Sequence, residues 1–151
     1  MRCLALDVGD RRIGTAASDE SGLIATPLTV IRRTSKAEDF RKIAQLVRER
    51  RVERLVVGHP LNADGSAGPQ ARRIERYAVA LEQALVAEEL DLEVLFWDEY
   101  LSTQRAQERM LAAGRKTKDR RARIDAVAAA VILQDYLCLL YTSDAADEVS
   151  P

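Results

Sequence analysis

The stretch LALDVGDRRIGTAASD, residues 4–19, contains two runs of small and apolar residues separated by a polar turn. The first run ends at Asp7, and the sequence Val8-Gly9-Asp10 follows at once. Because Asp and Gly favour turns, this pattern predicts two strands that form a β-hairpin. Asp7 then stands where the first buried strand ends. It can start the turn or carry chemistry, and the hairpin alone leaves both interpretations open.

The rest of the chain continues with strands and helices. Short apolar runs bounded by Gly, Pro or polar residues predict five strands, at residues 2–7, 12–18, 27–33, 54–60 and 93–99. Apolar residues at helical spacing predict four helices, which begin at Ser35, at Pro69, at Ser102 or Thr103, and near Ile124. Ser35 is the expected cap of the first helix, with Glu38 in the capping-box position. The last helix is expected to end near Leu137.

The order of the predicted elements defines the fold class. Three strands come first, and helices and strands then alternate. Hairpin connections pair strands antiparallel, whereas strand–helix–strand connections pair them parallel. The chain is therefore predicted to form an α/β domain with a mixed sheet. Its first three strands form an antiparallel meander, and helices cover the two faces.

Composition excludes several classes of protein. The 151 residues are enough for one domain with a real core. No apolar run approaches bilayer length and no charged-then-apolar leader precedes the first strand, so we expect a cytoplasmic protein without a membrane segment. The two cysteines lack metal-ligand spacing, which is consistent with that compartment. Because His59 is the single histidine, a catalytic triad or a His-based metal site is nearly excluded, and metal chemistry must rest on carboxylates.

The C-terminal stretch CLLYTSDAADEVSP, residues 138–151, differs abruptly in composition from the rest. From Cys138 to Glu148 it resembles the translation of a common sequencing adaptor. We therefore assign the native domain to residues 1–137 and treat 138–151 as a non-native tail, with a natural acidic tail as the alternative. The tail has three acids and no Lys or Arg, so without it the formal net charge changes from −1 to +2.

Three acids from distant parts of the chain form the candidate site. Asp7 ends the first strand, Glu99 ends the last, and Asp125 interrupts the apolar stripe of the final helix. A carboxylate in such a stripe is costly to bury unless it is paired or binds a metal. If the helix packs on the sheet, the three acids converge, and converging carboxylates favour Mg²⁺ or Mn²⁺. Each acid also has a structural alternative, which is a turn for Asp7 and ion pairs for the other two with Arg105 and Arg121.

Four stretches carry a resemblance that covers nearly the whole chain before the tail, namely LALDVGDRRIGTAASD, LVVGHPLNADGSAGPQA, FWDEYLST and RIDAVAAAVILQ. They resemble the RuvX/YqgF family of RNase H-like nucleases. The resemblance implies a five-stranded mixed sheet and a metal-dependent phosphodiesterase site, with Asp7, Glu99 and Asp125 as the catalytic acids. It also implies a role in maturing the 5′ end of precursor 16S rRNA, with Holliday-junction resolution as the alternative.

With two bound ions, such a site would hydrolyse a phosphodiester with water and would need no protein nucleophile. Asp7 is the candidate bridge between the ions, and Glu99 and Asp125 would each complete the shell of one ion. Two departures from the family pattern, Tyr100 and His59, leave the three acids in place but bear on how substrate is handled.

A nucleic-acid substrate also requires cations near the acids. Some candidate contacts follow Asp7 in the chain, and the others precede Asp125. They are Arg11, Arg12, Arg105, Arg109, Arg115, Lys116, Lys118, Arg120 and Arg121. The segment RKTKDRRAR, residues 115–123, is expected to be a mobile loop that orders on nucleic acid, with a solvated surface as the alternative. A second candidate is a phosphate loop whose contacts are Gly58, Asn62, Gly65 and Ser66. A plain surface turn explains the same four residues equally well.

Precursor rRNA is the favoured partner, branched DNA and ribosomal particles are further candidates, and the oligomeric state is left open. Two functions of other classes are the alternatives. The hairpin also resembles the phosphate-binding hairpin of actin-like ATPases and sugar kinases, but those proteins need two such domains and this chain has length for one. The other is a non-catalytic RNase H-like module that binds RNA or ribosomal proteins. Metal-dependent cleavage separates that module from a nuclease.

Overall fold

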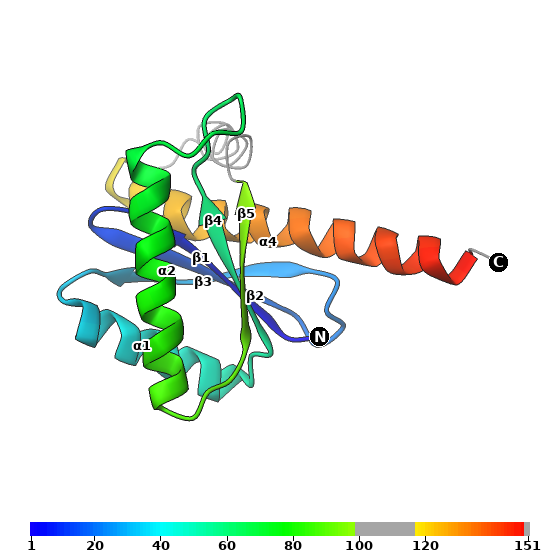
Figure 1. The fold of residues 1–151 in the computed structure, drawn as a ribbon, viewed down its shortest axis with the longest axis horizontal. Helices are drawn as coiled ribbons and strands as arrows, with labels where there is room; N and C mark the ends of the chain where they lie inside the picture. The colour runs from blue at the N-terminus through cyan, green and yellow to red at the C-terminus, as the bar shows by residue number, and fades with distance from the viewer. Residues whose placement is uncertain (99–116, 150–151) are drawn as a thin grey trace.

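The computed structural model describes residues 1–98 and 117–149, with the side chains of 1–98 and 124–140. Within these residues, five strands form one sheet in the order β3-β2-β1-β4-β5. They are β1 Cys3–Val8, β2 Arg12–Ser18, β3 Ala25–Arg32, β4 Arg54–His59 and β5 Glu93–Asp98. β2 pairs antiparallel with β1 and β3, whereas β4 pairs parallel with β1 and β5. The predicted mixed sheet and its opening meander are confirmed (Figure 1).

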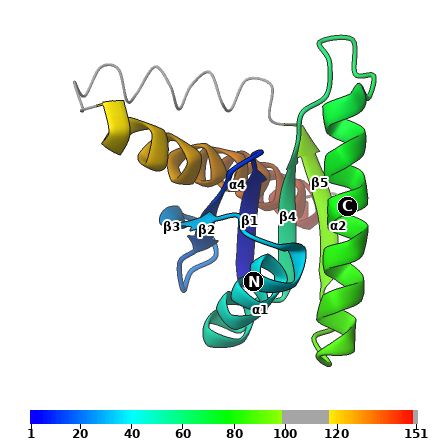
Figure 2. The ribbon, with the colours of Figure 1, turned by 90° about the vertical axis from the view of Figure 1, so that its left-hand side faces the viewer.

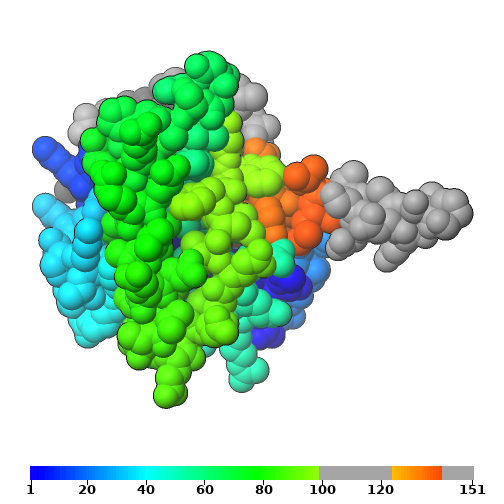
Figure 3. Space-filling view, viewed as in Figure 1, coloured from blue at the N-terminus to red at the C-terminus, as the bar shows by residue number. Residues whose placement is uncertain are grey.

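Helices cover both faces of this sheet, as Figure 2 shows. α1 Lys36–Arg50 and α2 Pro69–Ala87 lie over one face, and α4 Thr117–Val149 crosses the other. α2 and β5 lie side by side on the surface presented in Figure 3. The helix expected from Ser102 to Gly114 lies outside the described residues. No described helix is long and apolar enough to cross a membrane.

Alternate residues of β1 face the two helical layers. Leu4 and Leu6 belong to the core shared with α1 and α2, whereas Ala5 belongs to the core shared with α4. Successive side chains of a strand point to opposite faces, so Asp7, two residues after Ala5, lies on the α4 face. The central strand therefore presents its acid to the layer formed by the helix that carries Asp125.

Local sequence explains where the first two helices begin. Ser35 Oγ accepts a hydrogen bond from the Glu38 backbone N–H at 3.2 Å, which confirms the predicted cap of α1. The Glu38 carboxylate itself pairs with Arg41, one turn further along α1. Pro69 is the first residue of α2, a position where its missing N–H costs no helical hydrogen bond.

The last helix is longer than the sequence pattern predicts. α4 begins at Thr117, inside the basic segment, and continues past Leu137 to Val149. The predicted end near Leu137 is wrong because residues 138–149 contain no Gly or Pro that would stop a helix. Leu140 still packs against the core shared with α4, and the turns after it extend beyond the sheet (Figure 1).

Candidate active site

Asp7 of β1 lies opposite Gly14 of β2, its antiparallel partner in the sheet. A Cβ atom at Gly14 would lie 1.9 Å from the backbone oxygen of Asp125 and 2.2 Å from its carbonyl carbon. Only glycine therefore lets the α4 backbone approach β2 so closely at residue 125. Opposite residues of an antiparallel pair have Cα atoms about 4.5–5.5 Å apart. The structure thus brings Asp7 and Asp125 to the same end of the same sheet face.

The carboxylate of Asp125 is held by a cation from the sheet. Arg12 Nε donates a hydrogen bond to Asp125 Oδ2 at 2.6 Å, and both side chains are partly exposed. Arg12 is one of the predicted nucleic-acid contacts, and in the structure its guanidinium neutralises one of the candidate acids. The alternative partner of Asp125, Arg121, has a side chain outside the described ones.

The two described acids supply the oxygen ligands that Mg²⁺ and Mn²⁺ prefer. The third predicted acid, Glu99, lies outside the described residues and follows directly after Asp98, the last residue of β5. Within residues 1–98 and 124–140, no group of three His, Cys, Asp or Glu residues is arranged to hold a metal ion. A hard divalent cation therefore fits the chemistry of Asp7 and Asp125, and a full carboxylate shell requires a further ligand such as Glu99.

The predicted nucleic-acid contacts divide into three groups. Arg11 is exposed in the β1–β2 turn, next to Arg12. A second group, whose side chains are not described, lies in the first turns of α4 and consists of Lys118, Arg120 and Arg121. The predicted loop is therefore wrong from Thr117 onward, because no Gly or Pro in that part of the segment interrupts a helix. The remaining contacts lie outside the described residues and are Arg105, Arg109, Arg115 and Lys116.

The candidate phosphate loop closes on itself. The Asn62 backbone N–H donates to the Ser66 backbone oxygen at 2.9 Å, and Asn62 Nδ2 donates to Ser66 Oγ at 3.0 Å. Asp64 Oδ1 accepts from both the backbone N–H and the hydroxyl of Ser66. Gly65 has a φ of +85°, a conformation that glycine adopts readily. Gly58 lies in β4 opposite Trp97. These bonds account for the loop as a surface turn, so its phosphate role stays a prediction.

His59, one of the two predicted departures from the family pattern, joins three elements of the fold. It is the last residue of β4, and its Nε2 lies 3.0 Å from Glu75 Oε1 of α2. Its ring centroid lies 4.7 Å from that of Phe96 in β5. These contacts give His59 a packing role. Tyr100, the other departure, lies outside the described residues.

A sequence model of the RuvX family, described as Holliday junction resolvase, matches residues 1–138. The match spans the whole sheet, both helices on one face and the part of α4 that carries Asp125. The chain belongs to the RuvX family. The predicted resemblance is therefore confirmed.

Relatives of this RuvX chain have similar lengths. A protein of Synechococcus sp. (strain JA-3-3Ab) is 48% identical over 134 residues, which are 89% of this chain and 81% of the relative. A protein of Roseiflexus sp. (strain RS-1) is 43% identical over 136 residues, which are 90% of this chain and 93% of the relative. Both are named "Putative pre-16S rRNA nuclease". The family and these relatives are nucleases, so this RuvX chain is an enzyme that hydrolyses phosphodiester bonds.

Solved structures confirm the RNase H-like fold of this RuvX chain. Thermus thermophilus RuvC superposes with a TM-score of 0.55 at 14% identity, covering 94% of this chain and 97% of RuvC. The same protein in complex with a Holliday junction substrate superposes with a TM-score of 0.54, also at 14% identity, covering 87% and 91%. At this level of identity the likeness concerns the fold alone.

Sequence reasoning missed a second group of cations in this RuvX chain. They line a cavity of about 290 Å³ on the α1 and α2 side of the sheet, and they are Arg33, Lys36, Arg73 and Arg76. Arg33 follows β3, Lys36 begins α1, and the other two lie three residues apart in α2. The spacing of Arg73 and Arg76 within α2 was the single local signal for this group. It did not single out a site, because charges on a helix ordinarily mark only its solvated face.

Proposed function

We propose that this RuvX chain is a metal-dependent endonuclease that matures the 5′ end of precursor 16S rRNA in the cytoplasm, on ribosomal precursor particles. The close approach of α4 to β2 at Gly14, which gathers Asp7 and Asp125, is the observation that carries the catalytic part of this proposal. The substrate is supported by the names of relatives that are 43% and 48% identical.

Asp7, Asp125 and Glu99 are the proposed ligands of Mg²⁺ or Mn²⁺, with two ions as the proposed number. Bound there, such ions would lower the pKa of a coordinated water and stabilise negative charge on the leaving oxygen. Within the chain, Asp7 supplies a carboxylate from the central strand of the sheet, and Arg12 holds the carboxylate of Asp125 toward β2. This positioning matters because small displacements of catalytic groups cost large factors in rate.

Positive charge around the acids would bind the substrate through its backbone. Arg11 is exposed in the turn after Asp7, and the predicted basic contacts of α4 precede Asp125 in the chain. Contacts of this kind position a nucleic acid through its phosphates and carry no base sequence directly. We therefore propose that the substrate is selected by its shape and backbone path rather than by its bases.

Holliday-junction resolution is the second candidate function. The description of the family model and the RuvC complex with a Holliday junction substrate favour it. A resolvase cuts two strands symmetrically, which calls for a two-fold dimer. Precursor rRNA is preferred because the relatives named for it are far more similar to this chain than RuvC, which is 14% identical.

The test presents precursor 16S rRNA fragments and four-way DNA junctions to the protein in parallel, with Mg²⁺, Mn²⁺ or a chelator. We expect cleavage on the 5′ side of the precursor RNA with a divalent ion and none with the chelator. Asp7→Asn should keep the fold but lose activity by several orders of magnitude, because it removes a charge that gathers cations. Asp91→Asn, in an exposed loop, is the matched control.

Three outcomes would contradict this proposal in different ways. Preferential cleavage of junctions would favour the resolvase. Binding of RNA without cleavage under every metal condition would favour the non-catalytic module. Near-normal cleavage by Asp7→Asn would make Asp7 a turn residue and remove it from the catalytic site.

A further inference from the structure

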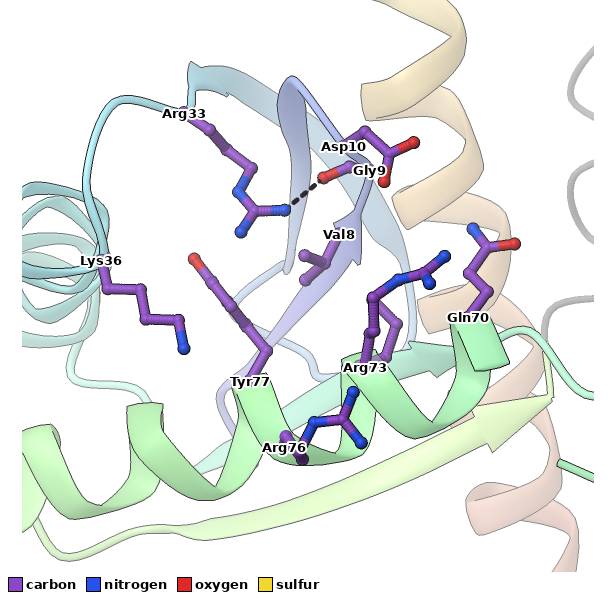
Figure 4. Close-up of a pocket in the computed structure, with 10 residues that line it drawn as sticks. Val8, Gly9, Asp10, Arg33, Lys36, Gln70, Arg73, Arg76 and Tyr77 are labelled. Atoms are coloured by element: carbon purple, nitrogen blue, oxygen red, sulfur yellow. Dashed lines mark hydrogen bonds between the residues drawn. The ribbon is translucent and has the colours of Figure 1, made fainter. Parts of the chain in front are cut away.

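A basic cavity opens on the sheet face opposite to that of Asp7. It lies between the β1–β2 turn, the start of α1 and the first half of α2, and its volume is about 290 Å³ (Figure 4). Four of its lining residues are cationic and one is acidic, namely Arg33, Lys36, Arg73, Arg76 and Asp10. The cavity is therefore strongly positive.

Arg33 is fixed in place at the wall of this cavity. Its Nη1 donates a hydrogen bond to the Gly9 backbone oxygen at 2.7 Å, and its guanidinium carbon lies 4.8 Å from the centroid of the Tyr77 ring. Its Nε lies 3.6 Å from Oδ2 of Asp39, which is 1% exposed. Asp39 also accepts hydrogen bonds from the Thr34 backbone N–H at 3.1 Å and from the Tyr77 hydroxyl at 3.5 Å. Asp39 is thus already engaged beneath the cavity.

The other three cations have no ion pair in the described part of the chain. The salt bridges found there engage none of Lys36, Arg73 and Arg76. Glu75, the acid next to Arg76 in sequence, lies against His59. Asp10 has its carboxylate turned away from Arg33 in Figure 4, where Lys36 and Arg73 lie on opposite sides of Tyr77.

The lining favours an anion with several oxygen acceptors. Lys and Arg side chains offer only donors, and the guanidinium fork matches phosphate geometry. The volume lies at the lower limit of about 300–1,000 Å³ for small-molecule pockets, which are mostly apolar, whereas this cavity is lined by charges. A phosphate group fits these features better than a whole cofactor does. Such an anion would also relieve the repulsion among the cations.

Two features connect the cavity with a nucleic-acid strand rather than with a free ion. Val8 and Gly9, which line it, follow directly after Asp7, so their Cα atoms lie within about 8 Å of the Asp7 Cα. A second hollow of about 440 Å³ adjoins the cavity, shares Arg73 and Arg76 with it, and is also lined by Arg72. The arginines of α2 therefore form a track longer than one anion needs.

We propose that the cavity bounded by Arg33, Lys36, Arg73 and Arg76 binds a backbone phosphate of the nucleic acid whose strand passes the Asp7 end of β1. This inference rests on the proposed nuclease function, because it takes the phosphate from a polynucleotide. It adds a phosphate contact on the second face of the sheet, away from Asp125 and α4.

The test measures binding of a labelled precursor 16S rRNA fragment in a chelator, so that cleavage plays no part. The variant is Arg73→Ala with Arg76→Ala, two exposed residues whose loss should leave the fold intact. Its charge-matched control is Arg48→Ala with Arg50→Ala, near the far end of α1. We expect the first variant to bind at least about tenfold more weakly than wild type, as the loss of one charge-assisted contact predicts. The slope of log affinity against log salt concentration is negative, and its magnitude should decrease by about 1.

Each result either distinguishes a polynucleotide phosphate from a free phosphate ligand or overturns the site. Equal affinities and salt slopes for the variant and its control would overturn the cavity as a phosphate site. Loss of binding to inorganic phosphate or a ribonucleoside monophosphate, with RNA binding unchanged, would assign the cavity to a free ligand and overturn the polynucleotide. Either result leaves the nuclease proposal standing, because that proposal fails by a different measurement, the cleavage activity of Asp7→Asn.

Discussion

Arg12 of β2 and Asp125 of α4 form a salt bridge, with 2.6 Å between Nε and Oδ2, across 113 positions of sequence. The bridge fastens α4 to the strand that pairs with β1, on the face that carries Asp7. It places the Arg12 guanidinium beside the Asp125 carboxylate, at the end of the sheet where Asp7 also lies. A divalent metal ion at the proposed site would therefore share or compete for a carboxylate that a guanidinium already neutralises.

Arg12→Ala should make the protein more dependent on divalent cations. The pair is partly exposed, so its loss should lower the free energy of unfolding by up to about 1 kcal/mol without metal. Without the Arg12 guanidinium, Mg²⁺ no longer competes for the Asp125 carboxylate and should bind the folded state more tightly. Added Mg²⁺ should then raise the melting temperature more than it does in wild type, because binding to the folded state stabilises it. Thermal unfolding with and without Mg²⁺ measures both effects. Arg11→Ala is the neighbouring control, and equal Mg²⁺ shifts in both variants would contradict the prediction.

Gly14→Ala should disturb the site without changing any acid. The new Cβ would lie 1.9 Å from the backbone oxygen of Asp125, so α4 must move away from β2. We expect a loss of at least about 1–3 kcal/mol in the free energy of unfolding, as overpacking costs, and a loss of nuclease activity. Gly68→Ala is the control, since its Cβ would find its nearest neighbours at 3.6 Å in the Asn62 side chain. Unchanged melting temperature and activity in Gly14→Ala would refute the close approach.

Ionisation of the Tyr77 phenol should make the protein less stable at alkaline pH. Burial, and then the negative charge of Asp39, raise the pKa of the Tyr77 phenol well above its usual value of about 10. The unfolded chain ionises this phenol near pH 10, so its contribution to stability is full below that pH and declines as the pH rises further. Tyr77→Phe should therefore show a shallower alkaline decline in the free energy of unfolding. Denaturant titrations at several alkaline pH values measure the slope, and an identical slope would count against the prediction.

Removal of the C-terminal stretch should leave the fold largely intact. Deletion of residues 141–151 should change the melting temperature little and leave activity unchanged. Deletion of 139–151 should cost slightly more, because Leu140 packs against the core shared with α4. Melting curves of the two truncated chains test this, and a large drop after the shorter deletion would mean that the end of α4 supports the fold.

Local patterns in the sequence by themselves determined the order of the strands and helices, the Ser35 cap and the mixed pairing of the sheet. They also singled out Asp7 and Asp125, because a carboxylate at the end of an apolar strand or inside an apolar stripe is visible within a few residues. These features depend on side-chain periodicity and turn chemistry, which are local properties. The same patterns failed at the end of α4, where a change in composition came without a residue that breaks a helix.

Only the tertiary structure decided which side chains meet. The sequence shows Arg12 and Asp125 but not their salt bridge, and it shows a glycine at 14 but not the helix backbone that lies against it. The basic cavity likewise draws Arg33 and Arg73 from elements that are neighbours only after folding. A residue's periodicity states which face of its own element it occupies. Its partner depends on how closely two elements pack, and the side chains of both elements set that distance together.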